Sequence, residues 1–100
     1  MATKTIFGSI NGEREITGGS GDFRLAEKAV DGVFTISFNN PFSDTPVVVA
    51  NCRDNETNTA ISAHIKQIEN GQVQLATMNG KDNTAWDCPF NFIAIGPTDD

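Results

Sequence analysis

The residues of this 100-residue chain that could do chemistry gather in one short segment near the carboxy terminus. The segment combines amide, ammonium and carboxylate groups with the single tryptophan of a chain that has no tyrosine: Asn79, Lys81, Asp82, Asn83 and Trp86. A sugar ring presents apolar C–H faces and a fringe of hydroxyl groups, so binding it requires an aromatic plane beside several polar groups. The segment therefore predicts a site for a neutral or amino sugar, with Trp86 stacked on the ring. The alternative is that Trp86 packs against a neighbouring subunit and the polar residues are only solvated.

The other reactive residue types do not form a catalytic arrangement in the sequence. His64 is the only histidine, and it alternates with Ser62 and Lys66 on the outward side of an expected strand. It has no second histidine, cysteine or carboxylate at the spacing of a metal site. Cys52 and Cys88 do not form a Cys-x-x-Cys pair and have no base nearby in the sequence that could activate a thiolate. We therefore expect neither an enzyme nor a bound metal or cofactor.

Net charge and apolar runs restrict the partners. Seven Lys and Arg residues stand against thirteen Asp and Glu residues, which gives a net charge of -6. No basic cluster could neutralise a phosphate backbone or an anionic lipid surface, and no apolar run approaches the ~20 residues that cross a bilayer. We therefore expect no nucleic acid, no membrane insertion, and neutral sugars before sialylated or sulfated ones. The start of the chain lacks the long apolar core of a signal peptide, which predicts a cytoplasmic protein as synthesised, or one exported without a cleaved signal.

Short strands must hold these residues in place. Pairs such as Asn11-Gly12 and Asn70-Gly71 accept positive φ at low cost and mark tight turns. Between the turns, apolar residues alternate with polar ones, as in Phe34-Thr-Ile-Ser-Phe38, which is the period of a strand with one buried face. No segment has a helical period. The pattern predicts strands over residues 4–9, 22–26, 33–39, 47–53, 60–69, 72–78 and 90–95.

These strands predict one domain over residues 1–100, an all-β, small antiparallel β-sandwich of about six strands. Residues 1–32 would supply lead-in strands and a Gly-rich connector at Gly18-Gly-Ser-Gly21, residues 33–96 the core sandwich, and residues 97–100 a tail. A domain of this size buries only roughly 60–68% of its extended surface, so association between subunits is expected. Cys52 and Cys88 stand at strand ends. They either meet across the sandwich as a disulfide or stay reduced, as a reducing compartment favours.

Two of the expected strands carry apolar side chains on both faces. Three valines follow one another at positions 47–49, and the last strand places Phe90 and Phe92 on one face and Ile93 and Ile95 on the other. A continuous apolar run in an antiparallel domain indicates either a bulge that shifts the register or a second covered face. In so small a domain, we expect the second cover to be another copy of the chain.

Core and turn motifs follow one another along the chain in a distinctive order: Ile36-Ser-Phe38, Pro41-Phe42, Pro46-Val-Val-Val49, Asn70-Gly71 and Phe92-Ile-Ala-Ile-Gly96. This order resembles the H-type lectin domain, the six-stranded antiparallel sandwich of snail agglutinin and of the discoidin carboxy-terminal domain. The earlier motifs Gly8-Ser-Ile-Asn-Gly12 and Asp31-Gly-Val-Phe34 are similar to lead-in sequences of such domains in bacterial and phage surface or tail-fibre proteins.

The resemblance implies trimers, sometimes stacked as hexamers, with sugar sites at the contacts between protomers. Gly80 and Lys81 stand where the family has an aromatic residue and a histidine, and Trp86 stands where it has a tyrosine, so the family's galactose-type preference is not carried over. Together, the resemblance and the polar segment predict an oligomeric, lectin-like carbohydrate-binding protein. The alternative function is a structural or trimerisation module of a phage or bacterial fibre-like assembly that binds no sugar.

Overall fold

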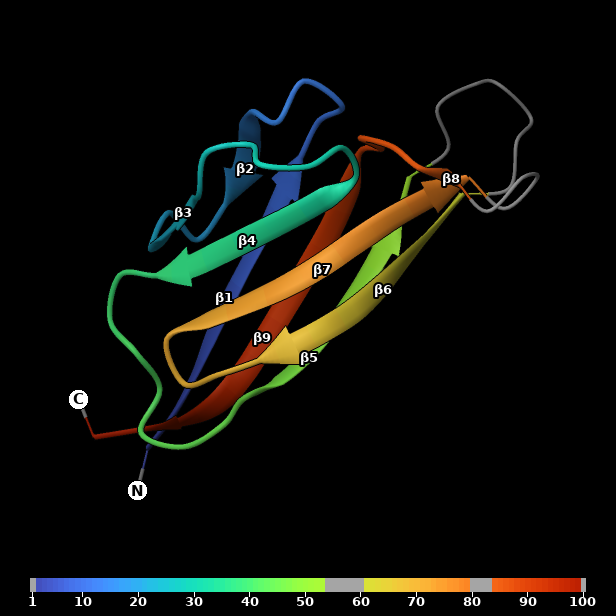
Figure 1. Ribbon diagram of the computed structural model, residues 1–100. Helices are drawn as coiled ribbons and strands as arrows, with labels where there is room; N and C mark the ends of the chain where they lie inside the picture. The colour runs from blue at the N-terminus through green and yellow to red at the C-terminus, as the bar shows by residue number, and fades with distance from the viewer. Residues whose placement is uncertain (1, 54–60, 80–83, 100) are drawn as a thin grey trace.

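Nine β-strands make up the protein in the computed structural model, which describes residues 2–53, 61–79 and 84–99 (Figure 1). No helix occurs in these ranges, so the all-β class predicted from the alternation is confirmed. The strands in chain order are β1 (Ala2–Ile10), β2 (Ile16–Gly19), β3 (Phe23–Leu25), β4 (Val33–Phe38), β5 (Val47–Cys52), β6 (Ile61–Ile68), β7 (Gln72–Asn79), β8 (Thr84–Ala85) and β9 (Phe90–Thr98).

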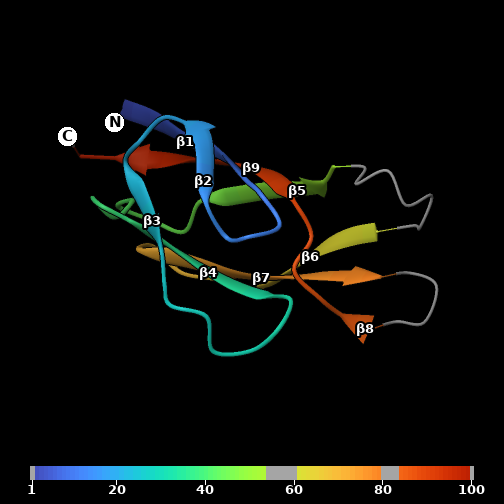
Figure 2. The ribbon, with the colours of Figure 1, turned by 90° about the horizontal axis from the view of Figure 1, so that it is seen from above.

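The strands form two antiparallel sheets that stack face to face (Figure 2). The first sheet has the order β2-β1-β9-β5. The second has the order β3-β4-β7-β6, with the short β8 paired to β7. The predicted antiparallel sandwich is therefore confirmed, with nine strands in place of about six. The strands that the sequence did not predict are β2 and β8, which have four and two residues and too little alternation to be recognised.

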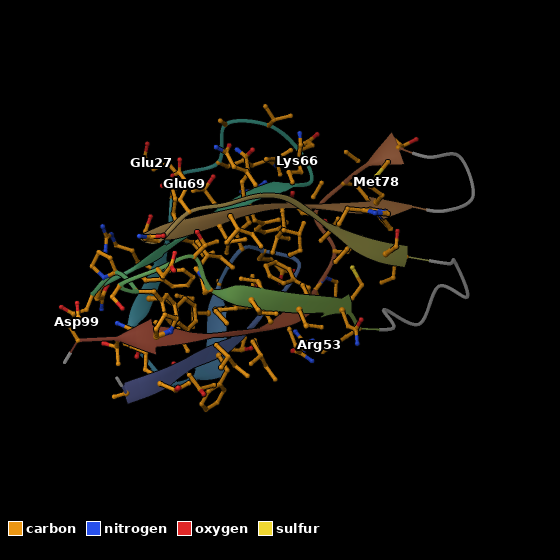
Figure 3. All side chains as sticks on the ribbon, turned by 90° about the horizontal axis from the view of Figure 1, so that it is seen from below. Glu27, Arg53, Lys66, Glu69, Met78 and Asp99 are labelled. Atoms are coloured by element: carbon orange, nitrogen blue, oxygen red, sulfur yellow. The ribbon has the colours of Figure 1, made fainter. Side chains whose placement is uncertain are left out.

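Aromatic and branched aliphatic side chains fill the space between the two sheets (Figure 3). Phe34 of β4 lies 4.8 Å from Phe90 of β9, and Phe23 of β3 lies 4.9 Å from Phe92 of β9, measured between ring centroids. Both contacts are edge-on, an arrangement that aromatic pairs prefer. Each contact joins one sheet to the other, so β9 is packed against the opposite sheet along its inner face.

The amino-terminal segment is central to the fold. β1 pairs with β9 along all nine of its residues, and its side chains Ile6 and Ile10 are buried in the common core. Gly18 and Gly19, predicted as part of a connector, instead lie in β2 and pair with β1. Glycine can take part in this pairing because pairing at a sheet edge requires backbone N–H and C=O groups, which glycine supplies as other residues do.

Candidate functional site

The predicted sugar-binding segment begins where β7 ends. Pairing between β7 and β8 sets Asn79 opposite Thr84, so the chain returns along β7 and then reaches Trp86. Lys81, Asp82 and Asn83 lie outside the described residues. The hairpin therefore brings the two ends of the predicted segment to one end of the second sheet.

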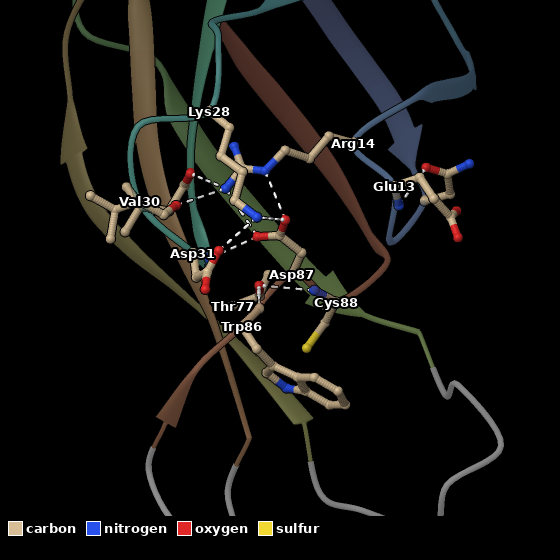
Figure 4. A network of polar contacts seen from close by, with 12 residues as sticks. Glu13, Arg14, Lys28, Val30, Asp31, Thr77, Trp86, Asp87 and Cys88 are labelled. Carbon is tan, nitrogen blue, oxygen red and sulfur yellow. Dashed lines mark hydrogen bonds and ion pairs between the residues drawn. The ribbon is translucent and has the colours of Figure 1, made fainter.

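Trp86 is held through its backbone by the buried Thr77 (Figure 4). The Trp86 N–H donates to the Thr77 carbonyl oxygen at 3.2 Å, and the Thr77 hydroxyl donates to the Trp86 carbonyl oxygen at 2.5 Å. The residue is partly buried, and its indole Nε1 is enclosed without a hydrogen-bond partner among the described residues. The backbone of Trp86 is thus held in position, and its side chain is only partly exposed to solvent.

Asp87, next to Trp86, is the centre of an ion-pair network that joins three segments of the chain (Figure 4). Arg14 donates to both carboxylate oxygens of Asp87, from Nε at 2.9 Å and from Nη2 at 3.0 Å. The Gly32 N–H donates to the same carboxylate at 2.7 Å, and the Lys28 ammonium lies 3.0 Å from it. Burial raises the pKa of Asp87, but the hydrogen bonds from Arg14, Gly32 and Lys28 outweigh it and lower the pKa to about 2.

Arg14 is positioned to make further contacts beyond this ion pair. Its Nη2 also donates to the carbonyl oxygens of Val30 and Val33, at 2.9 and 2.8 Å, and its guanidinium lies 4.1 Å from the centroid of the Phe34 ring. The backbone of Arg14 adopts a positive φ of 64°, which is uncommon for residues other than glycine. The sequence gives no sign of this network, because Arg14 and Asp87 are 73 positions apart and neither belongs to a motif.

Cys52 and Cys88 are both free thiols in the structure, half-buried and buried respectively. Burial, followed by the neighbouring Cys88 thiol, raises the pKa of Cys52 to about 12. Burial also raises the pKa of Cys88, against hydrogen bonds from Thr77 and Cys52 that lower it. The two thiols are therefore close enough to interact, and neither forms a thiolate readily at neutral pH.

His64 lies on the exposed face of β6, where its Nε2 is 3.0 Å from the Ser62 hydroxyl oxygen. A serine and a histidine at this distance are two parts of a nucleophile arrangement, which also requires a third group that orients the imidazole. No group of three His, Cys, Asp or Glu residues within the described ranges could hold a metal ion. The Ser62–His64 pair by itself is therefore not evidence for nucleophilic catalysis.

The outer face of the first sheet carries exposed apolar side chains that we call the outer apolar patch: Phe7, Val47, Val49, Ile93 and Ile95. Between 45% and 70% of each residue is exposed. The register sets Ile93 between Phe7 and Val49, and it sets Ile95 beside Val47. The five side chains therefore form one continuous surface across β1, β9 and β5.

No charged side chain interrupts this face at the outward positions of β1, β9 and β5 between Thr3 and Ser9, Asn91 and Pro97, and Val47 and Asn51. Its remaining outward residues are uncharged: Thr3, Thr5, Ser9, Asn51, Asn91 and Pro97. The chain has seven basic and thirteen acidic residues, so this exclusion of charge is a feature of the face and not of the composition. Uncharged apolar surfaces with a polar rim are typical of protein interfaces.

A shallow hollow of about 120 Å³ lies where this face becomes polar, lined by Val49, Asn51, Asn91, Phe92 and Ile93. Asn51 and Asn91 lie directly opposite each other on β5 and β9. Pockets for small molecules usually enclose about 300 Å³ or more. The hollow is therefore too small to be a sugar site by itself.

The pairing of β9 with β1 and with β5 is regular along the whole of both ladders. Register irregularities in the described strands lie elsewhere, between Ser9 and Ile10 against β2 and between Ile65 and Gln67 against β7. The prediction that a bulge explains the apolar residues on both faces of β5 and β9 is therefore wrong. The second apolar face of β5 and β9 lies open on the surface of the single chain.

Comparisons with known proteins do not extend this description. No family model matches the chain, and neither the curated proteins nor the solved structures contain a match. The likeness to H-type lectins stays a prediction from the sequence. The described ranges contain no helix with the length and hydropathy to cross a membrane.

Proposed function

We propose that this chain is a homo-oligomeric assembly module in which the outer apolar patch packs against the same face of other copies. The observation that supports this most is the set of five side chains, 45–70% exposed, on a face without charged residues. Covering such a surface is favourable, because each Å² of apolar area removed from water contributes roughly 25 cal/mol to the free energy of association. A second copy offers the same uncharged surface, so the contact would leave no buried charge unpaired.

The size of the patch indicates how much more of the face must be covered. Five side chains at these exposures present roughly 450 Å² of apolar surface. A standard interface uses about 800 Å² per partner, so the threonine, serine and asparagine rim must be covered as well. We expect a homotrimer or a dimer of trimers, the symmetry that the resemblance to H-type lectins implies. Such a unit would suit a structural or trimerising part of a phage or bacterial fibre-like assembly.

A carbohydrate-binding role is the second candidate, and the β7–β8 hairpin is the observation that favours it. The hairpin and the Asp87 network anchor both ends of the predicted segment, so a binding loop there would start and end on fixed backbone. Neutral or amino sugars are the expected ligands. Each site would bind in roughly the millimolar to high-micromolar range, and avidity would come from several sites on one oligomer.

Light scattering after size exclusion, on the whole chain, tests the assembly. We expect a mass of three or six chains at micromolar concentration and a smaller mass for Ile93→Lys, because an ammonium group at the centre of the patch cannot be buried unpaired. Gln67→Lys is the matched control, since it adds the same charge to an exposed residue of β6 in the other sheet. The control should keep the parent's mass. A monomeric parent would overturn the proposal.

A glycan array tests the second candidate on the intact protein beside Trp86→Ala, with the mass of both checked first. We expect the parent to retain neutral or amino sugars and the variant to lose them while staying assembled. A parent that binds no glycan, or a variant that stays assembled and binds equally well, would exclude the sugar site and leave the assembly role.

A further inference from the structure

β5 forms one edge of the first sheet, and no other described strand pairs with its outer side. It stands last in the strand order and hydrogen-bonds, within the described residues, to β9 alone. β6 of the other sheet lies beside it but belongs to a different ladder. In an antiparallel ladder, alternate residues direct their N–H and C=O groups away from the partner strand. β5 therefore presents a row of free backbone groups along six residues.

The other sheet edges carry features that prevent pairing, whereas β5 does not. β2, β3 and β8 have only four, three and two residues, and β3 exposes Arg24. β6 is longer, but it has an irregular register and an exposed lysine, Lys66. Short strands, charges and bulges are the known means of blocking an edge. β5 reads Val-Val-Val-Ala-Asn-Cys, without charge, glycine or proline, and pairs regularly with β9.

We propose that β5 pairs in antiparallel fashion with β5 of a second copy, across a two-fold axis at Val48, which extends the first sheet from four to eight strands. In this register Val47 of one copy lies opposite Val49 of the other, and the two Val48 residues face each other. Each side chain keeps its own face of the sheet, because the two positions of every pair have the same parity. The inference rests on the proposed function: it supplies the two-fold contact that distinguishes a dimer of trimers from a trimer.

The residues of β5 favour a second copy over an unrelated peptide. Valine opposite valine is a favourable cross-strand pair, and three such pairs form when the valine triplet meets itself. The same register joins the outer apolar patches of the two copies through Val47 and Val49. In this register Ala50 of one copy lies opposite Pro46 of the other, which has no N–H to donate, so the pairing is limited to the valine triplet. Arg53 follows the strand and is labelled at the end of β5 in Figure 3.

Amide hydrogen exchange at single-residue resolution, on the unchanged protein, tests this pairing. At concentrations where the protein is fully assembled, we expect the amides of the paired valines, residues 47–49, to exchange at least about 100-fold more slowly than unprotected backbone. Dilution that separates the copies should release protection at Val48, the residue of the triplet whose backbone groups point away from β9. β6 is the internal control, because its outward amides should exchange rapidly at both concentrations. A Val48 amide that exchanges as fast as the outward amides of β6 at every concentration would overturn the inference.

Masses of the parent and of Ile93→Lys separate this inference from the proposed function. Ile93 lies on the central strand β9, so its replacement leaves the free edge of β5 unchanged. A hexameric parent and a dimeric variant, both with protected β5 amides, would support both proposals. A trimeric parent whose outward β5 amides exchange fast would overturn only the edge pairing. A dimeric parent and an equally dimeric variant, both with protected β5 amides, would overturn only the packing through the outer apolar patch. A monomeric parent would overturn both.

Discussion

Asp87→Asn tests whether the ion-pair network stabilises the fold. The change keeps the size of the side chain and removes the charge that Arg14 contacts at 2.9 and 3.0 Å. Burial raises the pKa of Asp87, yet the bonds from Arg14, Gly32 and Lys28 lower it from the ordinary 3.8 to about 2. The folded state therefore binds the Asp87 proton less tightly than the unfolded chain does.

This difference in proton binding sets the pH range of the effect. The pKa of Asp87 is lower by almost two in the folded state than in the unfolded chain, which corresponds to roughly 2.5 kcal/mol in the free energy of unfolding. The side chains of Arg14 and Asp87 are only 13% and 15% exposed, so solvent screening reduces this little. Since the folded pKa is the lower one, the stabilisation is fully present above about pH 4–5 and is lost as the pH falls through 2. We expect the parent to lose roughly 2 kcal/mol through this group between pH 5 and pH 2.

Urea unfolding followed by the fluorescence of the single tryptophan measures this contribution. Asp87→Asn should unfold with roughly 2–3 kcal/mol less free energy at pH 7, because the buried guanidinium of Arg14 loses its countercharge. Its stability should then change much less between pH 5 and pH 2. Protomer concentration must be equal in all samples, since assembly adds to the measured stability.

Asp44→Asn is the matched control for this experiment. Asp44 is exposed and accepts a hydrogen bond from the backbone N–H of its neighbour Thr45 at 2.8 Å. Its replacement should change stability at pH 7 by no more than about 0.5 kcal/mol. If the parent and Asp87→Asn lose equal free energy between pH 5 and pH 2, the ionised Asp87 carboxylate does not stabilise the fold.

Two further predictions concern the core. Oxidised glutathione should convert Cys52 and Cys88 slowly into one intramolecular disulfide with release of two reduced glutathione molecules, because the thiols are neighbours but their raised pKa values keep thiolate scarce. Thiol titration of the unfolded protein and the mass of a single chain measure this, and two titratable thiols after long incubation would contradict it. Gly8→Ala should destabilise by about 2 kcal/mol or more, because a Cβ atom there would overlap a phenylalanine ring of the core. Gly18→Ala, where a Cβ atom meets nothing within 4 Å, is the control in the same thermal unfolding assay; equal melting temperatures for the two variants would refute the packing argument.

The sequence predicted the strands because side-chain alternation is a local property. Phe34 and Phe38 alternate with polar residues, and both are buried between the sheets as that period predicts. The same reasoning recognised that Ile93 and Ile95 do not share a face with Phe92. It could not recognise β2, because two of the four residues in that strand are glycines that leave no apolar pattern.

The candidate site was predicted only in part. The sequence predicted that Trp86 stacks on a sugar, which stays a prediction, but the anchoring of Trp86 by Thr77 depends on the path of the chain. The two cysteines could be recognised as a possible pair, and the structure places them as interacting free thiols. Such contacts depend on which strands become neighbours, and nothing in a single sequence specifies that.

By itself, the sequence determined the all-β class, the strands with one buried face, the net charge and the existence of a second apolar face. Each of these follows from residue type and from a period of two, which are properties of neighbours along the chain. Only the tertiary structure decided that the second face is open and uninterrupted by a bulge, because this depends on the register between β9 and its two neighbours. It also decided that Arg14 meets Asp87, since a contact across 73 positions arises only when both ends of the chain fold onto the same sandwich.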